Sequence, residues 1–375
     1  MLAVGADFGQ EELARAVAEA AYRRGALFVD VAYFDPYVKR ARIANADPET
    51  LGFVPPWFGE KLLALAGRGD ARMAFAGAVA PEAYEGLDPE RLGRDMLPSL
   101  KETGRVVGER STNWTIVPCP HQAWARLVYP DLDGETAYER LWQELTHVLR
   151  LDEPDPAAAW DERVAGLKRS AAALTERRFD AIELQGPGTE VTIGLLPTSE
   201  WHAGDFLTRN GLRHLPNLPT EEVFTTPDPE RTEGHVTSTR PLVLADGTIV
   251  RGLRVRFEGG RAVSVEADEN GAALRGRVEF DEGAARLGEV ALVDRHGRIG
   301  PLGTVFYDTL LDENAASHVA LGNGFPFTVG EEDAGRVNTS RIHVDFMVGS
   351  PELEVTGVTR EGERVPVLRG GDWQL

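Results

Sequence analysis

Short apolar runs and amphipathic stretches alternate along the first hundred residues. Apolar runs at 2–7, 26–34 and 71–79 have the length of buried strands. Between the first two runs, apolar residues recur at helical spacing up to Gly25, which predicts a helix followed by a capping glycine. Strand, helix and strand in this order predict a parallel sheet covered by helices.

The hydrophobic pattern becomes helical in the middle of the chain and strand-like in its second half. Residues 134–151 and 155–179 have helical periodicity, and Asp155 followed by Pro156 predicts the start of the second helix. From about residue 180, short strand-like runs alternate with glycine turns.

A β-hairpin is expected at residues 242–250, where Asp246 and Gly247 separate two apolar runs. We therefore predict an α/β chain with a β-rich second domain. Residues 1–115 would form an N-terminal parallel-sheet α/β domain, and residues 116–375 a C-terminal domain of mixed, mainly antiparallel β-structure with helices. A helical connecting region is expected at about 134–178.

Composition and charge indicate which partners and which cellular compartment to expect. The 375 residues carry a net charge of −20, which argues against a nucleic-acid partner. No apolar run approaches the ~18–20 residues of a membrane span. Cys119 is the single cysteine, so no intrachain disulfide can form, and the N-terminus lacks the pattern of a secretory signal. We expect a cytoplasmic protein that binds neither nucleic acid nor membrane.

Carboxylates and histidines gather in three blocks of the last third of the chain, at 219–228, at 287–293 with 312–318, and at 342–350. Carboxylate plus imidazole is a ligand set that divalent metals prefer, and two ions ~3.5–4 Å apart can both activate water and polarise a carbonyl. If the blocks converge, they make a carboxylate-rich, two-metal site. The candidate ligands are Glu221 or Glu222, Glu289, Glu313, His318, His343 and Asp345.

The spacing within the blocks sharpens this hypothesis. His343 and Asp345 are two apart, so on a strand they share a face. Glu313 and His318 are five apart, which predicts neighbouring parts of one helix or turn. The adjacent Glu221 and Glu222 point two ways on a strand, so one is a ligand and the other orients a ligand or acts as a base.

The same residues also have ordinary structural explanations that do not involve a metal site. Most glutamates in an acidic protein are solvated surface residues. The histidines at 202, 214, 235 and 296 lie among loop-like residues and are expected to be surface or cap residues. A nucleotide or small-molecule site in the N-terminal half has little support, because the first strand-to-helix turn carries only Gly5 and Gly9.

Longer motifs over most of the chain carry a resemblance. They include WARLVYPD, DPAAAW, GPGTEVTIGL, NLPTEEVFTTPD, DEGAARLGEVALV, FYDTLLDENAASH and NTSRIHVDFMVGS, in this order. In these motifs the chain resembles the thermophilic aminopeptidase family, the M29 metallopeptidases of the aminopeptidase T and S type. The resemblance implies two divalent ions per chain (Zn, Co, Mn or Mg) and release of single residues from short peptides with a free N-terminus. It also implies a homodimer that encloses the active-site chamber.

The resemblance also assigns roles. One metal would anchor the amino group and the other would polarise the scissile carbonyl, while a bridging hydroxide attacks and a nearby carboxylate, Glu221 or Glu222, moves the proton. The implied metal ligands are Glu222 (with Glu221 as the fallback), Glu289 as the bridge, Glu313, His318, His343 and Asp345.

The chain departs from the family pattern in three places. Phe325 stands on the substrate side, seven residues after His318, where family members carry tyrosine; a lost donor of this kind can cost on the order of 10²–10³ in rate. The stretch from Phe325 to His343 is shorter, and the first strand lacks the helix that usually precedes it, so the start is misassigned or a covering helix is missing. The alternative function is therefore a catalytically altered metal-binding relative that acts as a peptide-binding or regulatory protein.

Overall fold

The computed structural model describes residues 1–95, 101–244 and 247–375. They form two compact units, the first made of Met1–Thr146 and Asp205–Leu218, the second of His147–Gly204 and Pro219–Leu375. Spatial compactness does not test where a folding domain ends, so the boundary expected between residues 115 and 116 stays a prediction.

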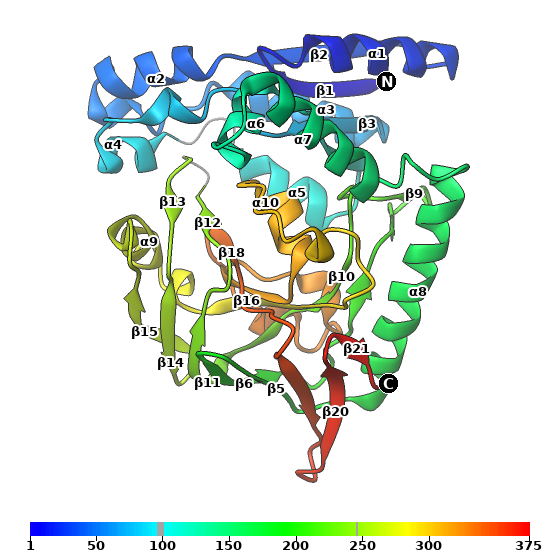
Figure 1. The fold of residues 1–375 in the computed structure, drawn as a ribbon, viewed down its shortest axis with the longest axis vertical. Helices are drawn as coiled ribbons and strands as arrows, with labels where there is room; N and C mark the ends of the chain where they lie inside the picture. Colours follow the sequence, from blue (N-terminus) through cyan, green and yellow to red (C-terminus); the bar gives the residue numbers. More distant parts are fainter. Residues whose placement is uncertain (96–100, 245–246) are drawn as a thin grey trace. The chain divides into compact units, whose positions relative to one another are not determined.

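The first unit contains the expected parallel sheet, with strand order β2-β1-β3-β4 and parallel pairing throughout (Figure 1). Its strands are β1 (Leu2–Asp7), β2 (Val29–Phe34), β3 (Ala71–Ala76) and β4 (Trp114–Pro118), with a short pair β8 (Phe206–Leu207) and β9 (Arg213–His214). The α-helices that begin within Met1–Thr146 are α1 (Glu11–Arg23), α2 (Pro36–Asn45), α3 (Pro56–Arg68), α4 (Pro89–Arg94), α5 (Lys101–Gly108), α6 (Gln122–Val128) and α7 (Gly134–Val148). Gly25 follows α1 with φ +87°, which confirms the glycine stop.

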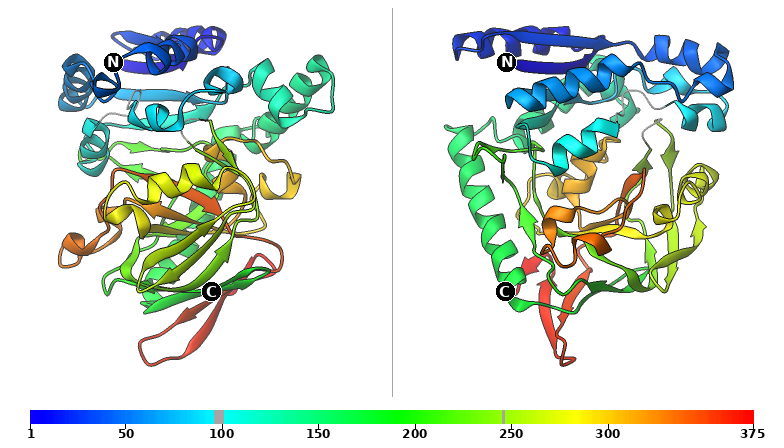
Figure 2. Two further views of the ribbon diagram at one scale, coloured as in Figure 1. Left: turned by 90° about the vertical axis from the view of Figure 1, so that its left-hand side faces the viewer. Right: turned by 180° about the vertical axis from the view of Figure 1, so that it is seen from behind.

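The second unit contains two larger antiparallel sheets, of order β15-β14-β11-β6-β5-β19-β20-β21 and β18-β17-β16-β10-β7. The long strand β11 and the protruding hairpin β19–β20 belong to the first of them (Figure 2). The strands are β5 (Ala181–Gly186), β6 (Thr189–Leu195), β7 (His202–Ala203), β10 (Glu222–Thr225), β11 (Pro227–Thr237), β14 (Arg254–Glu258), β15 (Arg261–Glu266), β16 (Leu287–Val293), β17 (His318–Gly322), β18 (His343–Met347), β19 (Glu354–Val358), β20 (Arg364–Arg369) and β21 (Asp372–Trp373). The predicted fold class, a parallel α/β part followed by antiparallel sheets, is confirmed.

Two local predictions about this unit are confirmed as well. Helix α8 (Pro156–Arg177) begins after Asp155, whose carboxylate accepts a hydrogen bond from the Ala158 N–H at 3.1 Å. Strands β12 (Leu242–Val243) and β13 (Ile249–Val250) pair as a hairpin, although Asp246 of its turn lies outside the described residues. The remaining helices are α9 (Gly271–Val278) and α10 (Thr309–Asp312).

The five-stranded sheet has one apolar face and one polar face. The apolar face belongs to the main core through Val223, Val290, Leu292, Val319, Leu321, Val344 and Phe346. Because side chains alternate along a strand, the residues next to these positions point to the other face. The polar residues among them are Glu222, Glu289, His318, His343 and Asp345.

Candidate metal centre

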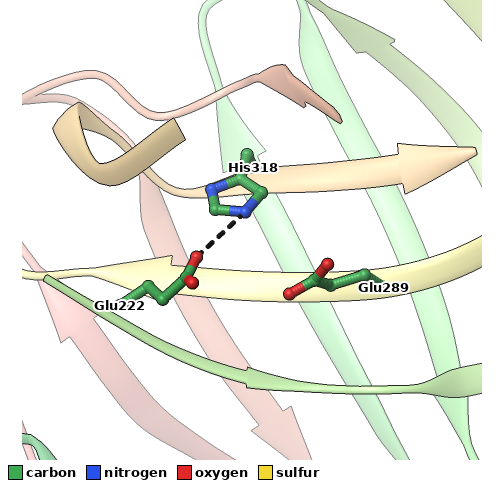
Figure 3. Close-up of side chains that lie close together, drawn as sticks. All are labelled: Glu222, Glu289 and His318. Atoms are coloured by element: carbon green, nitrogen blue, oxygen red, sulfur yellow. Dashed lines mark ion pairs between the residues drawn. The ribbon is translucent and has the colours of Figure 1, made fainter. Parts of the chain in front are cut away.

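Two groups of ligand atoms meet on the polar face of this sheet. In the first group, His318 Nε2 lies 3.2 Å from Glu222 Oε2, and Glu289 completes a set whose ligand atoms all lie within 4.8 Å of one another. Figure 3 shows these three side chains pointing toward a common space, with Glu289 across from the Glu222–His318 pair.

The second group shares Glu289 with the first. His343 Nε2 lies 3.1 Å from Glu289 Oε2 and 3.2 Å from Asp345 Oδ1. Their ligand atoms also lie within 4.8 Å of one another. A carboxylate shared by two such groups can bridge two ions.

A β-bulge turns Glu289 toward the polar face. Leu287 pairs with Leu321 on the core face, whereas Glu289 pairs with Ala320 on the polar face, so the register shifts at the residue between them. That residue is Gly288, where a Cβ atom would lie only 2.3 Å from the Asn323 carbonyl oxygen. Without the bulge, Leu287 and Glu289 would share a face, so this extra residue re-aims the carboxylate.

Both histidines are oriented by backbone carbonyls. His318 Nδ1 lies 3.2 Å from the Ala316 oxygen, and His343 Nδ1 lies 2.8 Å from the Asn323 oxygen. A carbonyl oxygen only accepts, so Nδ1 carries the hydrogen in each ring. In the neutral tautomer, Nε2 then presents its lone pair to the carboxylates, as in a metal-binding histidine.

The donor set therefore fits divalent cations. A neutral Nε2 and a carboxylate oxygen are both acceptors, so their close contact is favourable only when the imidazole is protonated or a metal cation lies between the two atoms. Glu222 Oε2 is buried and makes no hydrogen bond among the described residues, although it lies 3.2 Å from His318 Nε2. Oxygen and nitrogen ligands in this ratio suit Zn, Co, Mn or Mg.

The pKa shifts at the site also indicate that its clustered carboxylates favour a nearby positive charge. Burial, followed by the charges of Asp345 and Glu222, raises the pKa of Glu313 well above its usual 4.5. Burial alone would lower the pKa of His318, but Glu222, Glu289 and Asp345 raise it to about 10. Protons are thus strongly held when no ion compensates the carboxylates.

Glu313 lies beside these groups but in neither of the two ligand sets. It begins a 3-10 turn at Glu313–Ala315, whereas His318 is the first residue of β17. The prediction that both lie on one helix or turn is therefore wrong. His318 and the apolar residues after it pair with both β16 and β18, and this sheet pairing overrides the local sequence.

The structure does not bring Glu221 to the cluster. Its side chain is fully buried, and Arg150 Nη2 donates to Oε1 at 2.8 Å while Arg163 Nε donates to Oε2. Arg163 also pairs with Asp294 at 3.0 and 3.1 Å. The adjacent acids thus point two ways as expected, with Glu222 toward the histidines and Glu221 toward the arginines.

Aromatic side chains lie beside His343. The Phe325 ring lies 5.2 Å from the His343 ring, 5.6 Å from Phe224 and 5.5 Å from Phe327. His202 packs against Phe327 at 5.6 Å, so it is part of this aromatic group and not the surface or cap residue expected.

Several residues that contact the candidate ligand segments are not among those predicted from the sequence. Gly288 and Asn314 stood inside motifs already singled out, LGEVALV and DENAASH, so their position was a usable signal. Arg150 and Arg163 gave no signal, because their contacts with Glu221 span 71 and 58 residues.

Comparison with known proteins gives consistent results. The sequence model of the thermophilic metalloprotease family (M29) matches residues 1–373. Aminopeptidase T of Thermus aquaticus is 44% identical over 373 residues, which cover 97% of this chain and 91% of that protein. Aminopeptidase PepS of Streptococcus thermophilus is 34% identical over 386 residues, with 100% and 93% covered. The solved structure of wild-type AmpT from Thermus thermophilus superposes with a TM-score of 0.91 at 42% identity, covering 100% of this chain and 94% of that one.

Proposed function

The chain belongs to the thermophilic metalloprotease (M29) family, and on this premise we propose that it is an aminopeptidase that releases single residues from short peptides with two divalent ions. The observation that supports the two-ion site is the sharing of Glu289 by two ligand groups. The relatives at 44% and 34% identity are aminopeptidases by name, which supports the peptide substrate.

The proposed ligands divide between two positions. Glu222 and His318 would hold one ion, His343 and Asp345 the other, and Glu289 both. Glu313 faces the same charges and would complete the set. Divalent ions bound there would acidify a water molecule and polarise the scissile carbonyl.

The chain's own groups have separate tasks in this proposal. The surplus of carboxylates would attract the positively charged N-terminus of a peptide, and the ring of Phe325, beside His343, would contact the substrate. Of the two adjacent acids, Glu222 is the one that faces the ligand cluster, so it would be the one to move a proton there. Both oxygens of Glu221 are engaged by arginine, which supports a fixed, charged role for that residue.

The altered, non-catalytic alternative is not favoured. It depends on the missing hydroxyl at Phe325 alone, whereas the relatives at 44% and 34% identity are aminopeptidases by name. The two functions differ in turnover: the alternative predicts metal binding without hydrolysis.

A homodimer is also proposed. Several exposed apolar side chains of the first unit lie on the edge strand β2 or in the segments that flank it in the sequence, where pairing with another copy could cover them. They are Tyr22, Leu27, Phe28, Tyr33, Tyr37 and Val38, and the ring of Phe8 stacks on Tyr33. Among the described residues, no helix has the length and apolarity to cross a bilayer. Cys119 is buried, and the cytoplasmic location stays a prediction.

The direct test of the reaction class compares a leucyl peptide with its N-acetylated form. An aminopeptidase cleaves the first and spares the second, because the amino group is part of what the site recognises. Equal cleavage of both peptides, or cleavage of neither by metal-loaded protein, would contradict the proposal.

A further inference from the structure

Asn314 joins two of the candidate ligand segments that are far apart in the sequence. Its side chain is fully buried. Its Oδ1 accepts the N–H of Glu221 at 2.6 Å, across a separation of 93 residues. Its Nδ2 donates to the Leu310 carbonyl at 2.9 Å and to Glu313 Oε1 at 3.3 Å. One amide thus contacts the residue before Glu222 and the carboxylate of Glu313.

The chemistry at this position requires an amide. The N–H of Glu221 needs an acceptor, whereas the Leu310 carbonyl and the Glu313 carboxylate need donors. These partners fix which end of the amide is oxygen and which is nitrogen. An ionised aspartate has no donor, and leucine has neither group.

A purely local role would explain only part of this arrangement. The bond to the carbonyl of Leu310, four residues earlier, is a local contact that closes the turn after α10, and other polar side chains at this position could make a similar bond. The bonds to Glu221 and Glu313 are different, because they reach the two segments that carry ligands.

Glu221 is held from its other side as well. Its carboxylate is bound by Arg150 and Arg163, and its N–H is bound by Asn314. The peptide that precedes Glu222 is therefore fixed both through a side chain and through the backbone. Little freedom remains for the start of β10, where Glu222 begins the strand.

We propose that Asn314 is a positioning residue for the metal centre, which holds Glu222, through Glu221, and Glu313 at a fixed separation. The inference rests on the proposed metal site. Partners that orient ligands in this way typically contribute 10–100-fold to metal affinity. Removing the amide should therefore weaken metal binding in addition to any loss of stability.

The test measures Co²⁺ binding to the metal-free full chain by its visible absorption. Asn314→Leu keeps the side-chain size but loses all three hydrogen bonds. Asn314→Ser, which is too short to reach both segments at once, serves if the leucine variant does not fold. Thr189→Val is the matched control, because it removes a buried acceptor of the Thr237 N–H in the eight-stranded sheet, away from the centre.

The proposal expects the Co²⁺ dissociation constant to rise about 10–100-fold in the Asn314 variants, with a changed absorption band, and to stay unchanged in Thr189→Val. Wild-type affinity and spectrum in the Asn314 variants, with only a loss of thermal stability like that of the control, would overturn it. If the wild-type chain binds no Co²⁺, the proposed function fails together with this inference. Binding by the wild type and unaltered binding by the variants removes the inference alone.

Discussion

His343 Nε2 lies 3.1 Å from Glu289 Oε2, while its Nδ1 lies 2.8 Å from the Asn323 carbonyl. The carbonyl fixes the ring so that the ligand nitrogen faces a carboxylate that also belongs to the group around His318. In the proposed two-ion site, the carboxylate of Glu289 would therefore be the ligand through which the two metal positions depend on each other.

Replacing this shared carboxylate should affect both ions. Glu289→Gln removes the bridging charge, and we expect bound metal to fall from about two ions per chain toward zero. Glu222→Gln should remove mainly one ion. Metal analysis after dialysis measures both, with the exposed Glu190→Gln on β6 as the control. Loss of one ion only in Glu289→Gln would contradict a shared ligand.

The adjacent acids should separate stability from metal binding. Glu221→Gln removes the charge that pairs with the buried Arg150 and with the partly buried Arg163, and should lower the free energy of unfolding of the metal-free protein by about 3–5 kcal/mol. Glu222→Gln removes a carboxylate that repels Glu289 and Glu313 but pairs with His318, so metal-free stability should fall less than in Glu221→Gln, while metal affinity falls. Urea unfolding and metal titration give the two readouts. The reverse pattern would exchange the roles of the two residues.

Asp294 should make the second unit sensitive to acid. Burial alone would raise the pKa of Asp294, but Arg163 and the Trp373 N–H hold it below its usual 3.8. A carboxylate whose folded pKa is depressed stabilises the fold above its unfolded pKa, and this stabilisation is lost as pH falls through the folded pKa.

The expected result is a pH-dependent difference between wild type and Asp294→Asn. The wild type should be the more stable above about pH 4, by about 1.4 kcal/mol for each unit of pKa depression, and the difference should shrink below that pH. Chemical unfolding between about pH 2 and pH 7 measures it. A difference that is constant over this range would show that Asp294 acts through packing and not through charge.

Phe325→Tyr should reveal whether the missing hydroxyl limits the rate. The ring lies 5.2 Å from the His343 ring, so a phenol would stand beside the centre. We expect kcat to rise by up to about 10²-fold with little change in KM, because the added donor acts in the transition state. Phe327→Tyr, on the neighbouring ring, is the control. An equal gain in both variants would argue against a specific hydrogen bond.

Sequence predicted those parts of the site that depend on local spacing. The two-residue interval between His343 and Asp345 predicted that both lie on one strand face, and in the structure His343 Nε2 lies 3.2 Å from Asp345 Oδ1. The opposed directions of Glu221 and Glu222 followed from the same alternation. The partition of the fold into parallel and antiparallel parts followed from hydrophobic patterning.

Other features depend on contacts that no local pattern records. The bulge at Gly288 reverses the face of Glu289, because strand pairing decides which residue is left unpaired. The arginines of Glu221 and the amide of Asn314 reach their partners only in the folded chain. His318 becomes a strand residue because β16 and β18 lie on both sides of it.

The most direct measurement is hydrolysis of aminoacyl-nitroanilides by chelator-stripped protein, before and after addition of Zn²⁺, Co²⁺, Mn²⁺ or Mg²⁺, with bound metal determined on the same samples. The account predicts no activity without metal, recovery as about two ions bind per chain, and no cleavage of N-acylated substrates. Full activity in the stripped protein, or two bound ions with no turnover of any substrate, would contradict it.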